Sequence, residues 1–433
     1  MKRTKYFIAL ITIILFCFLA AFKNNKIIFK PPYINKNISD SSPCFLVISD
    51  VHLDITSTHK KDTPTDLWNG TKEKINQILS GKDGFACPKF VLVLGDLPAH
   101  DVSVDERKKD IDTVLSDLKK IADKNNVPVF YLPGNNDSWV GDYNAFSSQI
   151  FSSDSSLQTS SPLLKNNSLR LDAKIIDTSL WKNIGCYSAY PLGDNNVGKI
   201  KQKKLRLIAL NSVVFVDAYA EKESKQKQET DARKEIQWLT NQLKVAGSKN
   251  EMVLIAMHVP PGMNEYKGSQ FWSSEKMVNN TTIQDTFLRL VEKYKNNIVG
   301  ILSSHTHMDG VRKLLNEKGS FENLLISVPG ISRGHGNNPG VKVIYYDPKN
   351  FALNNFVTIY NSSTTDISKW STYSFRELFN KSKSCYSMRS VIDTMNMDRL
   401  KTIDSKIYLV DPSSIKSELI APIVGRSINV SYQ

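Results

Sequence analysis

Aspartate and histidine residues gather in five short motifs along the chain. The motifs are Ser49-Asp50-Val51-His52-Leu53-Asp54, Gly95-Asp96, Pro133-Gly134-Asn135-Asn136-Asp137, His258-Val259-Pro260-Pro261-Gly262 and Ser303-Ser304-His305-Thr306-His307. The chain has 7 histidines, and most of them belong to these motifs or, like His100, follow one closely. Carboxylate, imidazole and amide groups without sulfur are typical ligands of hard or borderline divalent metals.

The spacing within the motifs suits a metal centre. In an extended segment, the residues of Asp-x-His and His-x-His project from the same face. Two neighbouring metals need a bridging ligand, and a lone aspartate after a glycine turn, such as Asp96, fits that role. Such a metal pair clamps a phosphoryl group and generates hydroxide for in-line attack. Any one motif is common as ordinary polar residues at a strand end, but all five together favour a shared site.

Each motif directly follows an apolar run that predicts a strand or its end. Predicted strands are Phe45–Ser49, Phe90–Leu94, Val129–Leu132, Leu205–Leu210, Met252–Met257, Ile298–Leu302, Val341–Tyr346 and Phe356–Tyr360. Apolar residues at helical spacing predict helices over 65–80, 105–124, 231–245 and 282–295. This alternation predicts a layered α/β fold, in which the carboxyl ends of strands share one edge and bring the motifs together.

Composition divides the chain into four parts. Residues 1–22 form a signal peptide or signal anchor, because Lys2, Arg3 and Lys5 precede the apolar run Tyr6–Phe22. We expect 23–42 to be a linker, 43–361 the catalytic domain and 362–433 a mainly helical C-terminal subdomain. The predicted location is secreted or extracytoplasmic, and only the N-terminal anchor would contact a membrane.

Export also bears on the cysteines. Cys44, Cys87, Cys186 and Cys385 permit two disulfides in any of three pairings. The formal charge of +13 favours an anionic substrate or surface, although a generally basic solvated surface is the more ordinary interpretation. No nucleic-acid-binding motif accompanies the charge. We therefore expect a small phosphoester or polyphosphate as the partner.

The motifs resemble those of the calcineurin-like metallophosphoesterases, and among these the acid sphingomyelinase-like phosphodiesterases. The resemblance covers about 43–380, and its most specific stretch is Gly95-Asp96-Leu97-Pro98-Ala99-His100-Asp101. The Asn338-Pro339-Gly340 turn and the Tyr373-Ser374-Phe375 segment also resemble that group. The resemblance implies a four-layered metallophosphoesterase sandwich, here with a mainly helical C-terminal appendage.

The resemblance also implies roles for individual residues. Asp50, His52 and His307 would hold one metal; Asn135, His258 and His305 would hold the other; and Asp96 would bridge the two. The family implies zinc, while iron and manganese occur among its relatives. The implied activity is that of an exported phosphodiesterase that cleaves phosphodiester or nucleotide-type substrates through a metal-bridging hydroxide.

One departure from the family pattern concerns the leaving group. The usual Gly-Asn-His-Asp/Glu motif is here Gly134-Asn135-Asn136-Asp137. The catalytic position is therefore held by Asn136, whose amide cannot supply a proton at neutral pH. His100 matches the position proposed as a proton donor in acid sphingomyelinase-like enzymes. Alternatively, the substrate is a phosphoanhydride, since endopolyphosphatase-like relatives share the Gly-Asn-Asn-Asp version.

Two further readings remain open. Asn136 is the only feature that favours an inactive, exported binding protein, and the complete ligand set argues against that hypothesis. Arg333 and His335 lie in a glycine-rich loop near the end of the predicted catalytic domain. We expect them to contact the substrate phosphate, although a surface loop is an equally ordinary interpretation.

Overall fold

Two stacked β-sheets position every motif described above. The computed structural model describes residues 42–56, 62–146, 162–164, 173–193, 203–264, 267–361, 363, 366–379, 387–396 and 429–433. The first sheet has the order β18 (Trp370–Ser374), β17 (Leu353–Asn361), β16 (Gly340–Tyr346), β1 (Cys44–Ile48), β4 (Val91–Val93), β5 (Val129–Tyr131), β6 (Leu163–Leu164). The second has the order β19 (Asn429–Val430), β14 (Gly310–Leu315), β15 (Phe321–Ser327), β13 (Ile298–Ser303), β10 (Met252–Ala256), β9 (Leu205–Ala209), β8 (Tyr187–Tyr190), β7 (Lys174–Asp177).

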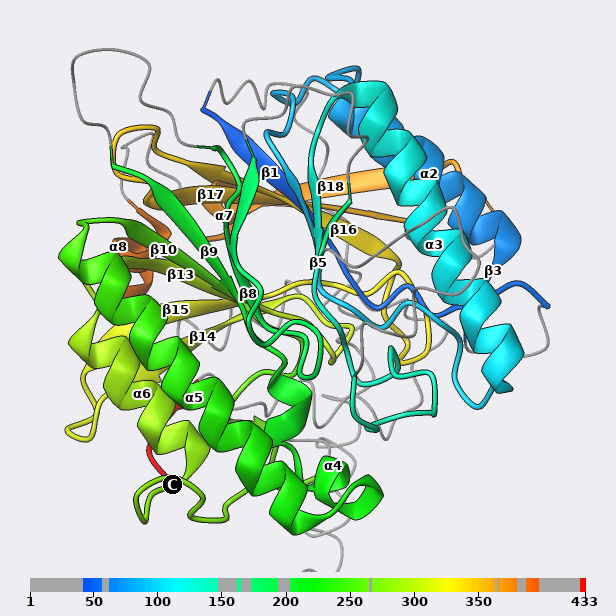
Figure 1. Cartoon of the computed structure of the whole chain (residues 1–433). Helices are drawn as coiled ribbons and strands as arrows, with labels where there is room; N and C mark the ends of the chain where they lie inside the picture. The colour runs from blue at the N-terminus through cyan, green and yellow to red at the C-terminus, as the bar shows by residue number, and fades with distance from the viewer. Residues whose placement is uncertain are drawn as a thin grey trace, which may run out of the picture. The chain divides into compact units, whose positions relative to one another are not determined.

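Helices cover the outer faces of the two sheets (Figure 1). On the first sheet lie α2 (Thr65–Leu79) and α3 (Val104–Asn125); on the second lie α5 (Lys225–Ser248) and α6 (Ile283–Lys293). Short elements connect these layers: β2 (Leu53–Asp54), β3 (Thr63–Pro64), η2 (Ser212–Phe215), α4 (Asp217–Lys222), β11 (Met263–Asn264) and β12 (Ser269–Gln270). The layer order is helix, sheet, sheet, helix, which confirms the predicted four-layered α/β fold.

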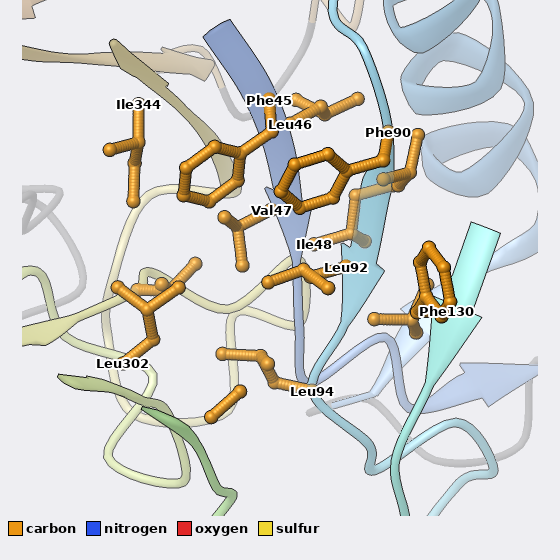
Figure 2. Close-up of a cluster of buried hydrophobic side chains, with 14 of the residues drawn as sticks. Phe45, Leu46, Val47, Ile48, Phe90, Leu92, Leu94, Phe130, Leu302 and Ile344 are labelled. Atoms are coloured by element: carbon orange, nitrogen blue, oxygen red, sulfur yellow. The ribbon is translucent and has the colours of Figure 1, made fainter. Parts of the chain in front are cut away.

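The core lies between the sheets and under the helices. Strand β1 sits between β16 and β4, and all of its residues are buried, as expected for a strand covered on both faces. Its side chains pack with Phe90, Phe130 and, from the second sheet, Leu302 (Figure 2). The rings of Phe45 and Phe90 stack with their centroids 4.6 Å apart. This packing fixes the strand end from which Asp50 and His52 emerge.

The predicted strands and helices correspond to elements of the structure, with shifts at their ends. Helix α3 begins at a capping box between Ser103 and Glu106 and ends where Asn126 adopts the left-handed conformation. Helix α5 begins at Lys225 rather than near Asp231, because the Ser224 side chain caps it by accepting a hydrogen bond from the backbone N–H of Lys227. The polar residues that obscured this start lie largely on its exposed side.

The described part of the C-terminal region combines short helices with strands that were not predicted. Helices α7 (Phe375–Phe379) and α8 (Met388–Asp393) form, but β18 pairs with β17 and β19 pairs with β14. Without β18, the backbone groups along that side of β17 would lack their sheet partners. Ile38–Gln433 form one compact unit, so the predicted boundary at residue 361 does not separate two units.

The predicted disulfides are absent from the part of the chain that the structure describes. Cys44, Cys87 and Cys186 are present as thiols. Cys44 and Cys186 are buried in different hydrophobic clusters, and Cys87 is exposed. Cys385 and the predicted signal segment lie outside the described residues. Within those residues, no helix combines the length and apolar character that a membrane span requires.

Candidate metal centre

The five motifs follow β1, β4, β5, β10 and β13 and converge where the two sheets meet. Backbone hydrogen bonds hold neighbouring motifs together: Asp50 N–H donates to the Gly95 carbonyl and His52 N–H to the Asp96 carbonyl, both at 3.0 Å. In the second sheet, Ser304 N–H donates to the His258 carbonyl at 2.9 Å. The parallel registers β1–β4–β5 and β10–β13 place these loops at a common edge.

Several of these motif residues have a backbone conformation that is rare for residues other than glycine. The φ angle is positive at Asp50 (47°), His52 (43°), Asp96 (56°), His305 (70°) and His307 (56°). Each such residue costs about 1–3 kcal/mol and persists only where the surroundings impose it. The hydrogen-bonded loops impose it here, and the result is a set of side chains that turn toward one point.

One group of side chains consists of Asp50, His52 and His307. Each offers a ligand atom, and these atoms lie within 4.8 Å of one another. The distance between His307 Nε2 and Asp50 Oδ1 is 3.6 Å. Gly330 passes directly beside this group: a Cβ on it would lie 2.9 Å from Asp50 Cβ and 3.0 Å from His307 Cγ. The group is therefore enclosed by backbone on that side.

A second group consists of Asp96, His258 and His305, whose ligand atoms also lie within 4.8 Å of one another. The side-chain oxygen of Asn135 joins it, 3.0 Å from His258 Nε2 and 2.9 Å from His305 Nδ1. Asn135 Nδ2 donates to the Asp142 carboxylate at 2.7 Å, which turns the amide oxygen toward the two imidazoles. Four potential ligand atoms thus face one small volume.

Asp96 lies between the two groups. Its Oδ2 is 3.4 Å from His52 Nε2 and 3.2 Å from His258 Nε2. The backbone around it is held by Asp137, whose carboxylate accepts the N–H groups of Gly134, Asp96 and Leu97 at 2.6–2.8 Å. There is no room for a side chain at position 134, since a Cβ would lie 2.2 Å from Asp96 Oδ1. This position suits a bridging carboxylate.

Buried polar atoms without hydrogen-bond partners test whether these residues fit a metal. Among the described residues, both carboxylate oxygens of Asp50 and Nε2 of His52 are buried and accept or donate no hydrogen bond. Such atoms are costly to bury unless something else compensates them. Nδ1 of His52 faces the Pro98 carbonyl at 3.1 Å and Nδ1 of His258 faces that of Leu94 at 2.6 Å. Both rings can therefore present an Nε2 lone pair to a metal, so the residues fit.

The pKa values of the buried aspartates and histidines also favour a bound cation. Burial raises the pKa of Asp50 to about 7, and burial lowers the pKa of His52 and of His305 to about 3. These imidazoles are therefore neutral, the form that binds metals. Burial alone would lower the pKa of His258, but the charge and hydrogen bond of Asp96 raise it to about 9. The carboxylates thus draw positive charge into the cluster, as a bound metal would supply.

His100 lies beside the first group. Its ring stacks on that of His52 with centroids 4.1 Å apart and an interplanar angle of 15°. The Asp62 carboxylate contacts it twice, at the backbone nitrogen (2.8 Å) and at Nδ1 (2.7 Å). Burial would lower the pKa of His100, but the hydrogen bond and charge of Asp62 raise it above its usual value. The ring is 39% exposed, so it remains accessible.

The other predicted site residues differ in where they lie. Asn136 is 1% exposed, and its backbone and side-chain N–H groups donate to Asp96 at 2.8 and 3.2 Å, so its amide is engaged by the carboxylate. His335 meets the His307 ring edge-on, with centroids 4.4 Å apart. Arg333 Nη2 donates to Asn361 Oδ1 and to the Ser363 carbonyl, which directs that nitrogen toward the end of β17.

Sequence reasoning missed two carboxylates that hold site residues. Asp62 orients His100, and Asp142 orients Asn135. Neither belongs to a motif or directly follows a predicted strand. Asp62 reaches the site because β3 pairs with β2 immediately after His52, a pairing of two residues on each side that leaves no periodic signal.

The model of the calcineurin-like phosphoesterase family matches residues 45–309. The chain is 26% identical to the cyclic GMP-AMP phosphodiesterase SMPDL3A of Bos taurus, over 64% of this chain and 57% of that protein. It is 25% identical to the sphingomyelin phosphodiesterase of Homo sapiens, over 63% and 39% of the two chains. Among solved structures it is similar to PhoD (TM-score 0.43, 10% identity, covering 77% of this chain and 69% of that chain).

The chain spans little more than half the length of the SMPDL3A proteins that it matches. The family match itself covers more than half of this chain and runs from β1 to the loop that carries His307, so it includes all seven candidate ligands. On that evidence the chain belongs to the calcineurin-like phosphoesterase family.

Proposed function

We propose that the chain is a two-metal phosphodiesterase. The observation that carries this proposal is the position of Asp96 between two groups of buried ligand atoms. Asp50, His52 and His307 would hold one ion, and Asn135, His258 and His305 the other, with Asp96 shared. Bound divalent ions would polarise the phosphoryl oxygens and lower the pKa of water for attack on phosphorus.

The side chains around the ions have separate tasks. His100 gives its proton to the leaving oxygen, since it is an accessible imidazole that stacks on His52 and belongs to neither ligand group. Asn136 holds Asp96 in place through two N–H groups. His335, edge-on to His307 and exposed, contacts a non-bridging oxygen of the substrate. Arg333 would contact a more distant part of the substrate.

The ligand set suggests the metal. Four imidazoles, two carboxylates and one amide oxygen form the proposed set, and imidazole-rich sites suit zinc and iron more than magnesium or calcium. We therefore propose zinc, with iron or manganese as the alternatives.

The substrate class we propose is a small, soluble phosphodiester of the nucleotide type. The similarity to cyclic GMP-AMP phosphodiesterases supports it, as does the formal charge of +13, which favours an anionic substrate. An ester leaving group needs a proton, and the well-held His100 supplies one. A phosphoanhydride needs none, so the position of His100 favours the diester over polyphosphate.

We also propose that the protein is exported. The support is the basic Lys2, Arg3 and Lys5 before the apolar Tyr6–Phe22. Fractionation of cells that express the full chain would place it outside the cytoplasm, and recovery in the cytosolic fraction alone would contradict export.

A substrate panel tests the proposed activity. The full chain, purified and supplied with zinc or manganese, should hydrolyse bis-p-nitrophenyl phosphate and a cyclic dinucleotide, and a chelator should abolish both reactions. His305→Ala should lose activity on every substrate, because it removes a ligand. Shortening of polyphosphate without cleavage of any diester would replace this proposal with a phosphoanhydride hydrolase. Absence of both bound metal and activity would indicate a binding protein.

A further inference from the structure

We propose that Asp62 is the positioning residue that makes His100 an effective proton donor to the leaving group. The proposal rests on the proposed phosphodiesterase function and identifies a residue that neither the motifs nor the family match singles out. Asp62 and His100 would act as a dyad beside the metal centre, in which Asp62 never touches the substrate.

The contacts between the two residues fix both the backbone and the ring of His100. One carboxylate oxygen of Asp62 accepts the His100 backbone N–H at 2.8 Å, and the other lies 2.7 Å from Nδ1. The Asp62 side chain is 2% exposed, so water competes little for these bonds. A buried carboxylate that makes both bonds leaves the ring little freedom to rotate.

The ring orientation then determines which nitrogen is free to react. His100 stacks nearly parallel on His52, with centroids 4.1 Å apart. Because Asp62 occupies Nδ1, Nε2 is the nitrogen that remains available to a substrate. The stacking on His52 keeps that nitrogen beside the first ligand group.

Backbone pairing delivers Asp62 to this place. Thr63 N–H donates to the His52 carbonyl at 2.8 Å, and Leu53 N–H donates to the Leu97 carbonyl at 2.8 Å. Ala99 N–H in turn donates to the Leu53 carbonyl at 3.1 Å. The backbone at His52 and Leu53 therefore pairs with Thr63 on one side and with Leu97 and Ala99 on the other. These bonds fix the distance between Asp62 and His100.

A third metal ion is the competing explanation, because His52, Asp62 and His100 each offer a ligand atom within 4.8 Å of the others. His52 has no nitrogen to spare for it. Its Nδ1 faces the Pro98 carbonyl at 3.1 Å, and its Nε2 lies 3.4 Å from Asp96 in the main centre. The dyad explains the contacts with hydrogen bonds alone.

The proposed step transfers one proton. His100 begins as an imidazolium whose Nδ1–H donates to Asp62, and the carboxylate stabilises the positive charge. As the bond between phosphorus and the leaving oxygen breaks, Nε2–H gives its proton to that oxygen, and the leaving group departs as an alcohol. The ring is left neutral, with its remaining proton on Nδ1 and held by Asp62, and it regains the second proton from solvent.

Asp62→Asn tests the dyad with little change in shape. When the oxygen of the introduced amide accepts the His100 backbone N–H, the amide nitrogen donates to Nδ1, and the ring must hold its proton on Nε2 as a neutral imidazole. A neutral imidazole is a poor acid, so the variant should lose about 10²–10⁴-fold in kcat/KM on diesters with a poor leaving group, such as an alcohol. With p-nitrophenolate, which needs no proton, it should stay within about threefold of wild type.

Controls separate this effect from general damage. Asp101→Asn removes the same charge one residue from His100, at an exposed position whose left-handed backbone suits Asn; it should leave the leaving-group dependence unchanged. His100→Ala should show the same steepened dependence as Asp62→Asn, and the double variant should lose no more. If Asp62→Asn folds poorly, Asp62→Ser should give the same dependence.

The possible outcomes distinguish failure of the Asp62–His100 dyad from failure of the proposed phosphodiesterase function. Equal loss on good and poor leaving groups in Asp62→Asn, with wild type active on diesters, would overturn the dyad and leave the phosphodiesterase proposal standing. Loss of one bound metal ion in Asp62→Asn, measured as metal content, would overturn it in favour of the third-ion explanation. A wild type that cleaves no diester would overturn both.

Discussion

The candidate ligands are oriented by hydrogen bonds to neighbouring residues that are not ligands themselves. Carbonyl oxygens of Pro98 and Leu94 orient His52 and His258, and Asp142 orients Asn135. Such outer partners fix the direction of a ligand's lone pair and are part of the metal affinity. The positive φ angles of Asp50, Asp96 and their neighbours show that the backbone of the ligand loops is also held in an unusual conformation.

Asp142→Asn should weaken metal binding without unfolding the protein. The introduced amide could donate to the Asn135 oxygen as readily as accept from its nitrogen, so the Asn135 oxygen would no longer be directed at His258 and His305. We expect a loss of about 10–100-fold in affinity for one ion, measured by competition with a chelator. The exposed Asp105→Asn on α3 is the matched control. Equal affinities in the two variants would refute this role.

At the residue scale, the sequence predicted that the motifs after the apolar strands would come together, and the resemblance to metallophosphoesterases implied which seven of their residues would be ligands. Asp62 and Asp142 were not predictable, because their partners are defined only by tertiary pairing. The hydrogen bond from the Asn136 side chain to Asp96 was not predicted either, because the motif that contains Asn136 suggested contact with the substrate.

Secondary-structure elements bring the ligand loops into register. The loop that carries His307 continues to Asp309, whose carboxylate accepts hydrogen bonds from Lys342 Nζ on β16 at 2.8 and 2.9 Å, and from Thr358 on β17 and Tyr373 on β18. Asp309 and Lys342 are both 0% exposed. This buried cluster ties a loop of the second sheet to three strands of the first.

Lys342→Met should destabilise the fold strongly. It leaves the Asp309 charge buried without its cation, a change that costs about 3–5 kcal/mol in free energy of unfolding. Lys225→Met, at an exposed ion pair with Glu275, should cost less than about 1 kcal/mol. Denaturant titration of both variants measures the two values. A loss at Lys342 no greater than that at Lys225 would show that the cluster does not hold the sheets together.

The main strands and helices were predictable because hydrophobic periodicity marks them directly. Strands β7, β8, β14 and β15 of the second sheet were not predicted, and neither were the short edge strands β18 and β19, which only the folded chain creates. The early start of α5 was missed because Lys225–Thr230 are polar throughout, and the cap at Ser224 has no apolar neighbour to mark it.

At the scale of the whole molecule, stability should depend on pH through Glu235. This carboxyl lies on α5 and is 0% exposed, and burial raises its pKa well above the usual value. The folded state therefore keeps a proton that the unfolded state releases above about pH 4.3, and folding stability falls as pH rises from there toward the raised pKa.

Glu235→Gln should remove that dependence. The variant cannot ionise, so its Tm relative to wild type should increase as the pH rises above about 4.3. Glu229→Gln, on the same helix and exposed, should track the wild type at every pH. Thermal unfolding across this range measures all three proteins. A constant difference between Glu235→Gln and wild type would contradict a protonated Glu235.

We propose that the candidate centre, where the loops after β1, β4, β5, β10 and β13 converge, holds two ions. Native mass spectrometry of the full chain, saturated with zinc and then desalted, counts them directly. We expect two ions per chain in the wild type and fewer in Asp96→Asn, which lacks the shared carboxylate. A wild type that retains one ion or none would contradict the account.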